Sequence, residues 1–151
     1  MDRQVLSGER DAMTHKGGCH CGNVRLTLRL SQPPDQTRLR ACSCSFCRAH
    51  ATRTTSDAAG AAEIWAEDWD LVMRYRFGSR TAEYLICSRC GVYIGAVCAT
   101  ALGTRAVINT NSLADWALFT ETPAQVDHDE EATEERMARR SASWTPTILH
   151  R

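Results

Sequence analysis

The sequence has no long hydrophobic run and no excess of charge of either sign. A membrane-spanning helix needs about 20 consecutive, mostly apolar residues, and none of the 151 residues lies in such a stretch. The formal net charge is +0, so the overall charge does not favour binding to nucleic acid or to an anionic membrane. Residues 1–16 also lack the apolar segment of a secretory signal peptide. These absences predict a cytoplasmic protein with no nucleic-acid or membrane partner.

Cysteine, in contrast, is abundant, with 8 residues in the chain. Seven of them fall in three clusters: Cys19-His20-Cys21, Cys42-Ser43-Cys44-Ser45-Phe46-Cys47 and Cys87-Ser88-Arg89-Cys90. In a reducing compartment, clustered thiols more often bind metal or take part in catalysis than form disulfides. Zinc accepts four thiolates in a tetrahedron, and the spacing lacks the usual cysteine runs of iron–sulfur proteins. The clusters therefore predict bound zinc.

The seven thiols can be divided between zinc ions in two ways. One division gives a closed four-thiol site and an open three-thiol site: Cys19, Cys21, Cys87 and Cys90 in the first, and Cys42, Cys44 and Cys47 in the second. The other division joins Cys44 and Cys47 to one of the outer pairs and leaves the remaining thiols without metal. We favour the first because it leaves no cluster unused. It predicts two zinc ions per chain, one structural and one catalytic, since a three-ligand zinc has a free position for substrate.

Three further residues are considered with these clusters. His50 follows the central cluster and can supply a fourth ligand or act as an acid or base, although a single histidine is usually a surface residue. Arg48 can bind a substrate carboxylate or remain solvated. Cys98 lies in an apolar segment and is expected to be a core residue.

The hydrophobic pattern predicts a mainly β protein. Residues 24–30 alternate between apolar and polar and are typical of a half-buried strand, whereas residues 92–99 are apolar on both faces and indicate a buried one. Residues 48–60 have no clear period and are expected to form an exposed loop. Further strands are expected at residues 37–41, 62–66, 69–77, 81–86 and 105–109.

The two ends of the chain differ from its middle. Residues 1–16 are polar and non-periodic, and we expect a flexible N-terminal segment. Residues 127–140 place acids first and arginines last, an order that complements a helix dipole and predicts a short surface helix or tail. Trp144 and Ile148 are expected to dock the C-terminal segment on the domain.

The three clusters with their flanking residues resemble the glutathione-dependent formaldehyde-activating enzyme family, which includes centromere protein V. The segments concerned are Gly18-Cys19-His20-Cys21-Gly22, Cys42-Ser43-Cys44-Ser45-Phe46-Cys47-Arg48 and Cys87-Ser88-Arg89-Cys90-Gly91. The resemblance implies an Mss4-like fold of small antiparallel sheets around zinc. It implies a zinc-binding domain at residues 17–115 and a C-terminal extension, residues 116–151, packed on it. It also implies the same structural and catalytic zinc sites as the division favoured above.

The resemblance further implies a carbon–sulfur lyase-type enzyme similar to S-(hydroxymethyl)glutathione synthase. In such an enzyme a zinc-held thiol adds to a small aldehyde or is released from it. The expected partners are therefore a small thiol, such as glutathione, and an aldehyde, such as formaldehyde. Two other functions stay open: a non-catalytic zinc-binding interaction module, which a fourth protein ligand on the central zinc would favour, and a hydrolase that uses metal-bound water.

Overall fold

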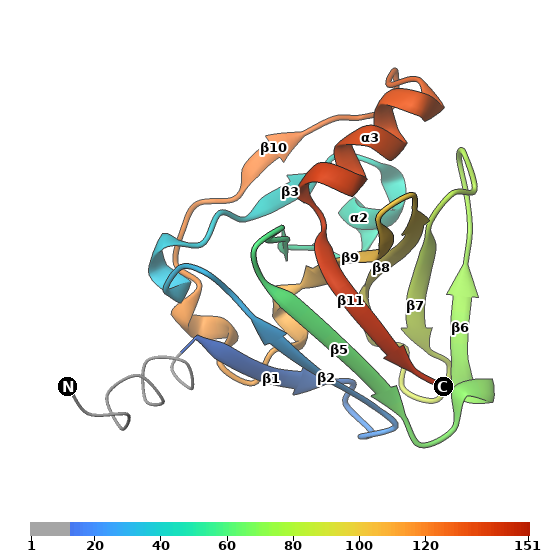
Figure 1. Cartoon of the computed structure of the whole chain (residues 1–151). Coiled ribbons are helices and arrows are strands. Elements are labelled where there is room, and N and C mark those ends of the chain that lie inside the picture. Colours follow the sequence, from blue (N-terminus) through green and yellow to red (C-terminus); the bar gives the residue numbers. More distant parts are fainter. Residues whose placement is uncertain (1–12) are drawn as a thin grey trace.

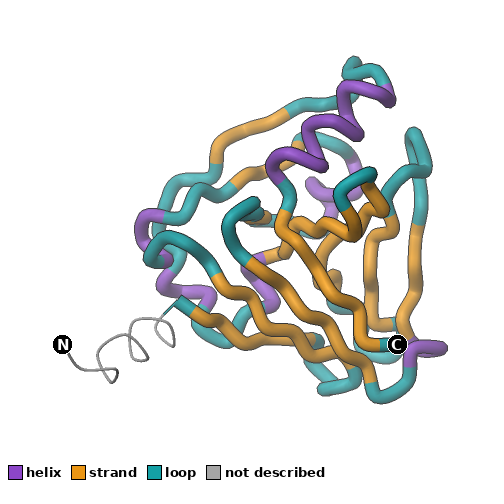
Figure 2. The backbone as a smooth tube through the Cα atoms, in the orientation of Figure 1, coloured by secondary structure: helices purple, strands orange, loops and turns teal. Residues whose placement is uncertain are grey.

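The computed structural model describes residues 13–151, and the prediction of a mainly β protein is confirmed. Figure 2 shows that strands dominate and that the helical segments are short. The two α-helices of the described residues are α2 (Ser45–Ala49) and α3 (Thr133–Ser143). The strands are β1 (Thr14–Gly18), β2 (Val24–Arg29), β3 (Arg40–Cys42), β4 (Thr54–Thr55), β5 (Ala61–Ala66), β6 (Val72–Tyr75), β7 (Glu83–Cys87), β8 (Tyr93–Thr100), β9 (Gly103–Asn109), β10 (Ala124–Val126) and β11 (Thr145–His150). Short 3-10 turns lie at η1 (Pro34–Gln36), η2 (Trp69–Leu71), η3 (Thr110–Ser112) and η4 (Trp116–Leu118).

The strands form one continuous mixed sheet. Its main order is β1-β2-β5-β11-β9-β4-β3-β10, and β8, β7 and β6 continue in turn from the other edge of β9. The resemblance implied small antiparallel sheets, but β11 runs parallel to β5 and β10 runs parallel to β3. Two neighbouring strands that run parallel must be joined by a long crossover segment of the chain. Both pairs here join a C-terminal strand to a strand from the first half of the chain.

The C-terminal strand β11 lies inside the sheet rather than on its surface. Figure 1 shows β11 between β5 and β9, where Thr147 pairs with Ala62 and Thr145 pairs with Ala106. Residues 116–151 thus supply two strands to the sheet, whereas the sequence had indicated an extension packed on a finished domain. Trp144 is buried as expected, but Ile148 is 56% exposed and does not dock the segment.

The first described strand, β1, begins inside the segment expected to be flexible. It pairs with β2 along its whole length. His15 is only 1% exposed, and its Nδ1 lies 2.6 Å from Asp115 Oδ2. The polar residue types of β1 hide its pairing, because a hydrophobic pattern does not reveal a buried histidine whose Nδ1 pairs with a distant carboxylate. The rest of the expected N-terminal segment, residues 1–12, lies outside the described residues.

The core lies against β2, β5 and β8. Val24, Leu26 and Leu28 of β2 are buried on one face, as the alternation of residues 24–30 predicted. Each fully buried aliphatic side chain contributes about 2 kcal/mol of hydrophobic stabilisation. The predicted buried strand at residues 92–99 is also found, as β8. A second, smaller cluster forms where α3 covers β8 and β9, with Ala82, Ala96, Cys98, Val107 and Trp144 as its buried residues.

Residues 48–60 do not form the expected exposed loop. Thr54–Thr55 form β4, which pairs with β3 and β9, and both threonines are buried. The hydroxyl of Thr55 donates a 2.8 Å hydrogen bond to the carbonyl of Arg38, which satisfies this polar group inside the protein. A two-residue strand without an apolar side chain has no hydrophobic pattern, and for this reason the sequence did not reveal it.

The predicted C-terminal helix is present but shifted. It was expected at residues 127–140 and is found as α3, Thr133–Ser143. Its Arg140 is buried, so the helix contributes one charged residue to the interior in addition to its solvated face. None of the helices within residues 13–151 has the length and apolar character needed to cross a membrane.

Candidate metal centres and the adjoining cavity

The four outer thiols meet at one point, as the favoured division predicted. The Sγ atoms of Cys19, Cys21, Cys87 and Cys90 all lie within 4.8 Å of one another. Cys21 Sγ is 3.6 Å from Cys19 Sγ and 3.6 Å from Cys87 Sγ. Cys19 and Cys21 come from the turn between β1 and β2, whereas Cys87 ends β7 and Cys90 lies in the turn between β7 and β8. This group can hold a metal ion between two turns that are distant in sequence.

Equivalent backbone hydrogen bonds close the two turns. Cys19 N–H donates to the carbonyl of Val24, and Cys87 N–H donates to the carbonyl of Val92, each at 3.0 Å. Each turn contains a glycine in the left-handed region, Gly22 with φ 85° and Gly91 with φ 80°. Glycine adopts this backbone without the steric penalty of a Cβ atom. The glycines thus let each turn fold back and direct two thiols to the same side.

The three central thiols also converge. Cys42 ends β3, Cys44 is the N-cap of α2, and Cys47 lies buried within that helix. Their Sγ atoms lie within 4.8 Å of one another. The backbone N–H of Cys47 is 3.4 Å from Cys44 Sγ, so the cap positions one sulfur of the group. The turn from β3 into the helix brings thiols at offsets of 0, 2 and 5 residues to a single point.

The donors in the central group suit a soft cation. A hydrogen bond from the Cys47 thiol lowers the pKa of Cys42 to about 5, and the same contact raises the pKa of Cys47. Burial raises the pKa of Cys44. The group therefore carries a thiolate at neutral pH, next to two further sulfur donors. Thiolate sulfur is a preferred zinc ligand, so these residues fit a zinc ion.

The two residues considered beside the central cluster do not join it. His50 is exposed at the end of α2, where its Nδ1 lies 2.9 Å from the Phe46 carbonyl. Among the described residues, the ligand group around Cys44 contains three cysteines and no histidine. Arg48 is exposed and does not line the cavity beside the thiols. Cys98 is buried, as expected.

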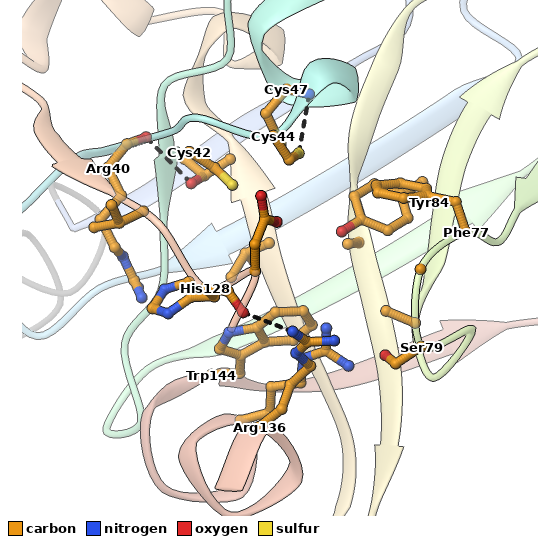
Figure 3. Close-up of a pocket in the computed structure, with 18 of the residues that line it drawn as sticks. Arg40, Cys42, Cys44, Cys47, Phe77, Ser79, Tyr84, His128, Arg136 and Trp144 are labelled. Carbon is orange, nitrogen blue, oxygen red and sulfur yellow. Dashed lines mark hydrogen bonds between the residues drawn. The ribbon is translucent and has the colours of Figure 1, made fainter. Parts of the chain in front are cut away.

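The central thiols form part of the wall of a cavity of about 460 Å³. Figure 3 shows Cys42, Cys44 and Cys47 on one side, Trp144 and Arg136 on the other, and His128 between them. The lining includes aromatic and charged side chains: Phe77, Tyr84, Tyr93 and Trp144, then Arg40, Arg136, Arg139, Arg140, His128 and Asp129. A cavity of this size can admit a small organic ligand.

No sequence motif marks His128, which the fold brings into the cavity. β10 runs parallel to β3, with Val126 opposite Cys42, and Ser43 N–H donates to the Val126 carbonyl at 3.0 Å. The residues that follow Val126 therefore pass beside the central thiols. β10 has only three residues, and no local pattern in the sequence indicates its distant partner.

Two cavity residues have altered proton affinities. Burial, together with the charge of Arg139, lowers the pKa of His128, so its imidazole is neutral at neutral pH. Burial raises the pKa of Tyr84, and the nearby thiolates add to this effect, so its phenol stays protonated. The cavity thus contains a proton acceptor, His128, and a hydrogen-bond donor, Tyr84.

Comparison with known proteins gives two results that agree with this arrangement. A crystal structure of a Rhodobacter sphaeroides protein is similar, with 26% sequence identity and a TM-score of 0.53 over 74% of this chain and 99% of that one. The model of the glutathione-dependent formaldehyde-activating enzyme family matches residues 14–128, which include both thiol groups and end at His128. Because that match extends over most of the sequence, the chain belongs to the glutathione-dependent formaldehyde-activating enzyme family.

Proposed function

We propose that this chain is a zinc-dependent enzyme that joins a small thiol to a small aldehyde and catalyses the reverse cleavage. The observation that carries the proposal is the convergence of Cys42, Cys44 and Cys47 on the wall of a cavity. A zinc ion held by three protein ligands has one position left for an exogenous ligand. The family name points to glutathione as the thiol and formaldehyde as the aldehyde.

The two metal centres have different proposed roles. The four-thiol group, Cys19, Cys21, Cys87 and Cys90, would hold a structural zinc, because four thiols complete its tetrahedron. The three-thiol group would hold the catalytic zinc. When bound there, zinc would lower the pKa of a coordinated thiol and so supply a thiolate nucleophile at neutral pH.

The reaction is an addition that requires no oxidant or reductant. The thiol sulfur forms a bond to the aldehyde carbon, the π electrons of the carbonyl move to its oxygen, and the thiol proton ends on that oxygen. Neutral His128 can accept the proton of the entering thiol. Tyr84 can donate a hydrogen bond to the aldehyde oxygen as negative charge develops there. The reverse sequence cleaves the carbon–sulfur bond.

The cavity walls favour a polar, anionic thiol. Phe77, Tyr84 and Tyr93 contribute aromatic rings to the lining beside the thiols. The arginines of the lining provide positive charge that attracts carboxylates. Glutathione carries both a thiol and carboxylates, so it combines the two kinds of group that the walls accommodate.

Cobalt substitution with a matched cysteine variant tests the proposal. Thiolate-to-cobalt charge-transfer bands respond to the number of thiolate ligands, so glutathione should change the spectrum of the wild-type protein. Cys44→Ser should abolish this response, whereas Cys98→Ser, which changes a buried cysteine outside both ligand groups, should retain it. Adding formaldehyde should then produce the hydroxymethyl thiol adduct, followed by NMR, faster than the spontaneous reaction.

No spectral response to thiols, together with a protein side chain such as His50 as a fourth ligand of the central metal, would contradict the catalytic proposal. That result would favour the non-catalytic zinc-binding module.

A further inference from the structure

Two side chains of the cavity lining each contain a buried N–H donor that lacks an acceptor. Within residues 13–151, Nε of Arg140 and Nε1 of Trp144 make no hydrogen bond, although both atoms are fully buried. Arg140 is 6% exposed and Trp144 is 5% exposed, and both line the cavity that contains the central thiols. Buried donors are nearly always paired, because an unpaired one carries its full desolvation cost. Two unpaired donors in one cavity therefore indicate that a ligand supplies the acceptor.

The two side chains are held together on one face at the end of α3. Trp144 follows Arg140 by one helical turn, and its backbone N–H donates to the Arg140 carbonyl at 3.0 Å. The Arg140 guanidinium lies over the indole ring, with its Cζ 4.8 Å from the ring centroid. Arg140 Nη1 also donates to Thr81 Oγ1 at 2.7 Å. These contacts fix both donors in place without using Arg140 Nε or the indole N–H.

The charge of Arg140 is not neutralised by a nearby carboxylate. Among the residues that the structure describes, none of its nitrogens forms an ion pair, whereas Arg136 and Arg139 are both paired with Glu131. The indole face offsets part of this charge through a cation–π contact. Asp129 is the one carboxylate in the described lining of the cavity. The end of the cavity around Arg140 is therefore positive and suited to an anion.

We propose that Arg140 and Trp144 form a carboxylate-binding subsite, which holds a carboxylate of the thiol substrate remote from its sulfur. This inference rests on the proposed function, which places the thiol end at Cys42, Cys44 and Cys47. Tyr84 lines the same cavity as the central thiols and Arg140. Each N–H donor can bond one carboxylate oxygen, and a thiol without an anionic group would leave both donors unpaired.

A probe that cannot act as a thiolate isolates this subsite from the thiol chemistry. S-methylglutathione retains both carboxylates but has no free thiol, and its diethyl ester has no carboxylate. Isothermal titration calorimetry of the zinc-loaded wild-type protein should show binding of S-methylglutathione. The diethyl ester should bind at least about tenfold more weakly, as expected for the loss of hydrogen bonds to a charged group.

Two conservative variants and one control assign the effect to the proposed donors. Trp144→Phe removes the indole N–H but keeps an aromatic ring, and it should weaken S-methylglutathione binding by about three- to tenfold. Arg140→Lys keeps the charge but loses the Nε donor, and it should weaken binding by about tenfold or more. Arg25→Gln changes an exposed arginine outside the cavity and should bind as the wild type does. Circular dichroism of each variant checks that it is folded.

The inference is overturned if S-methylglutathione does not bind, if the acid and the ester bind equally, or if folded Trp144→Phe binds with wild-type affinity. A separate assay distinguishes this failure from failure of the proposed function. The rate of adduct formation from formaldehyde and 2-mercaptoethanol, a thiol without a carboxylate, depends on the central thiols and not on the subsite. If the protein accelerates that reaction but binds S-methylglutathione and its diethyl ester equally well, the proposed function is retained and the subsite is rejected.

Discussion

The Sγ atoms of Cys21 and Cys87 lie 3.6 Å apart, although 66 residues separate them in the sequence. A metal ion shared by their two turns would link the β1–β2 hairpin to the β7–β8 hairpin. The three central thiols lie within six residues, so a metal ion there closes only a short local loop. Cross-linking distant segments restricts the unfolded chain far more than closing a short loop does. The two centres should therefore differ in their contribution to stability.

We expect Cys87→Ser to destabilise the fold far more than Cys44→Ser. Binding energy at a structural zinc is folding energy, so Cys87→Ser should leave the protein unfolded or aggregated. Cys44→Ser should retain most of the thermal stability and lose adduct formation. Thermal unfolding followed by circular dichroism measures the difference, with Cys98→Ser as a control outside both groups. Equal destabilisation by the two ligand variants would mean that both metals are structural.

Metal analysis should find two zinc ions per chain in gently purified protein. Each thiol group provides the donors for one ion, and the chain has seven clustered cysteines for the purpose. Cys44→Ser should contain about one zinc per chain, because a site reduced to two thiols holds zinc poorly. Inductively coupled plasma mass spectrometry with titration of free thiols checks both numbers. One zinc in the wild type, with three reactive thiols, would argue against the open site.

The activity should decrease as the pH falls through the pKa of His128. The proposed role requires the neutral imidazole, and burial together with Arg139 holds this pKa below its ordinary value of 6.5. The acidic limb of the kcat/KM profile should therefore lie below pH 6.5. His128→Gln should lower kcat/KM by about 100-fold, a typical contribution of a general base, and should remove this limb. An unchanged pH profile in the variant would assign the proton transfer to another group.

The Glu131 carboxylate should stabilise the protein at neutral pH but not in acid. It receives hydrogen bonds from Arg139 at 2.9 and 3.0 Å, and these lower its pKa from the ordinary value of 4.5. A lowered pKa means that the stabilisation is complete above the unfolded pKa and disappears as the pH falls through the folded one. Glu131→Gln should cost about 0.5–1 kcal/mol at pH 7. Urea unfolding should show this difference at pH 7 and a smaller difference at pH 3.

Deleting residues 145–151 should unfold the protein, because β11 lies between β5 and β9. The deletion would leave two strand edges of the sheet without partners. A comparison with Ile148→Ser, which changes an exposed residue of the same strand, separates loss of the strand from a surface effect. The deletion variant should lose its cooperative thermal transition, and Ile148→Ser should retain it. A cooperative transition in the truncated protein would show that the sheet folds without β11.

Local signals in the sequence determined a large part of this protein. Thiol spacing predicted both thiol groups, because cysteines a few residues apart can direct their sulfurs to one point. The alternation of residues 24–30 and the apolar run at residues 92–99 predicted β2 and β8, since burial of one or both faces of a strand appears directly in residue type. The family resemblance, carried by the cysteine motifs, agreed with the match over residues 14–128.

The cavity, in contrast, was decided by tertiary structure. The parallel pairing of β10 with β3 brings His128 beside thiols that lie more than 80 residues earlier in the chain. The packing of α3 over β8 and β9 buries Arg140 in a segment that the sequence indicated to be a solvated face. Both relationships depend on contacts between segments distant in sequence, and no local period or spacing records such contacts. Thiol spacing alone therefore predicted the two thiol groups, and only the folded chain determined which side chains face the central group.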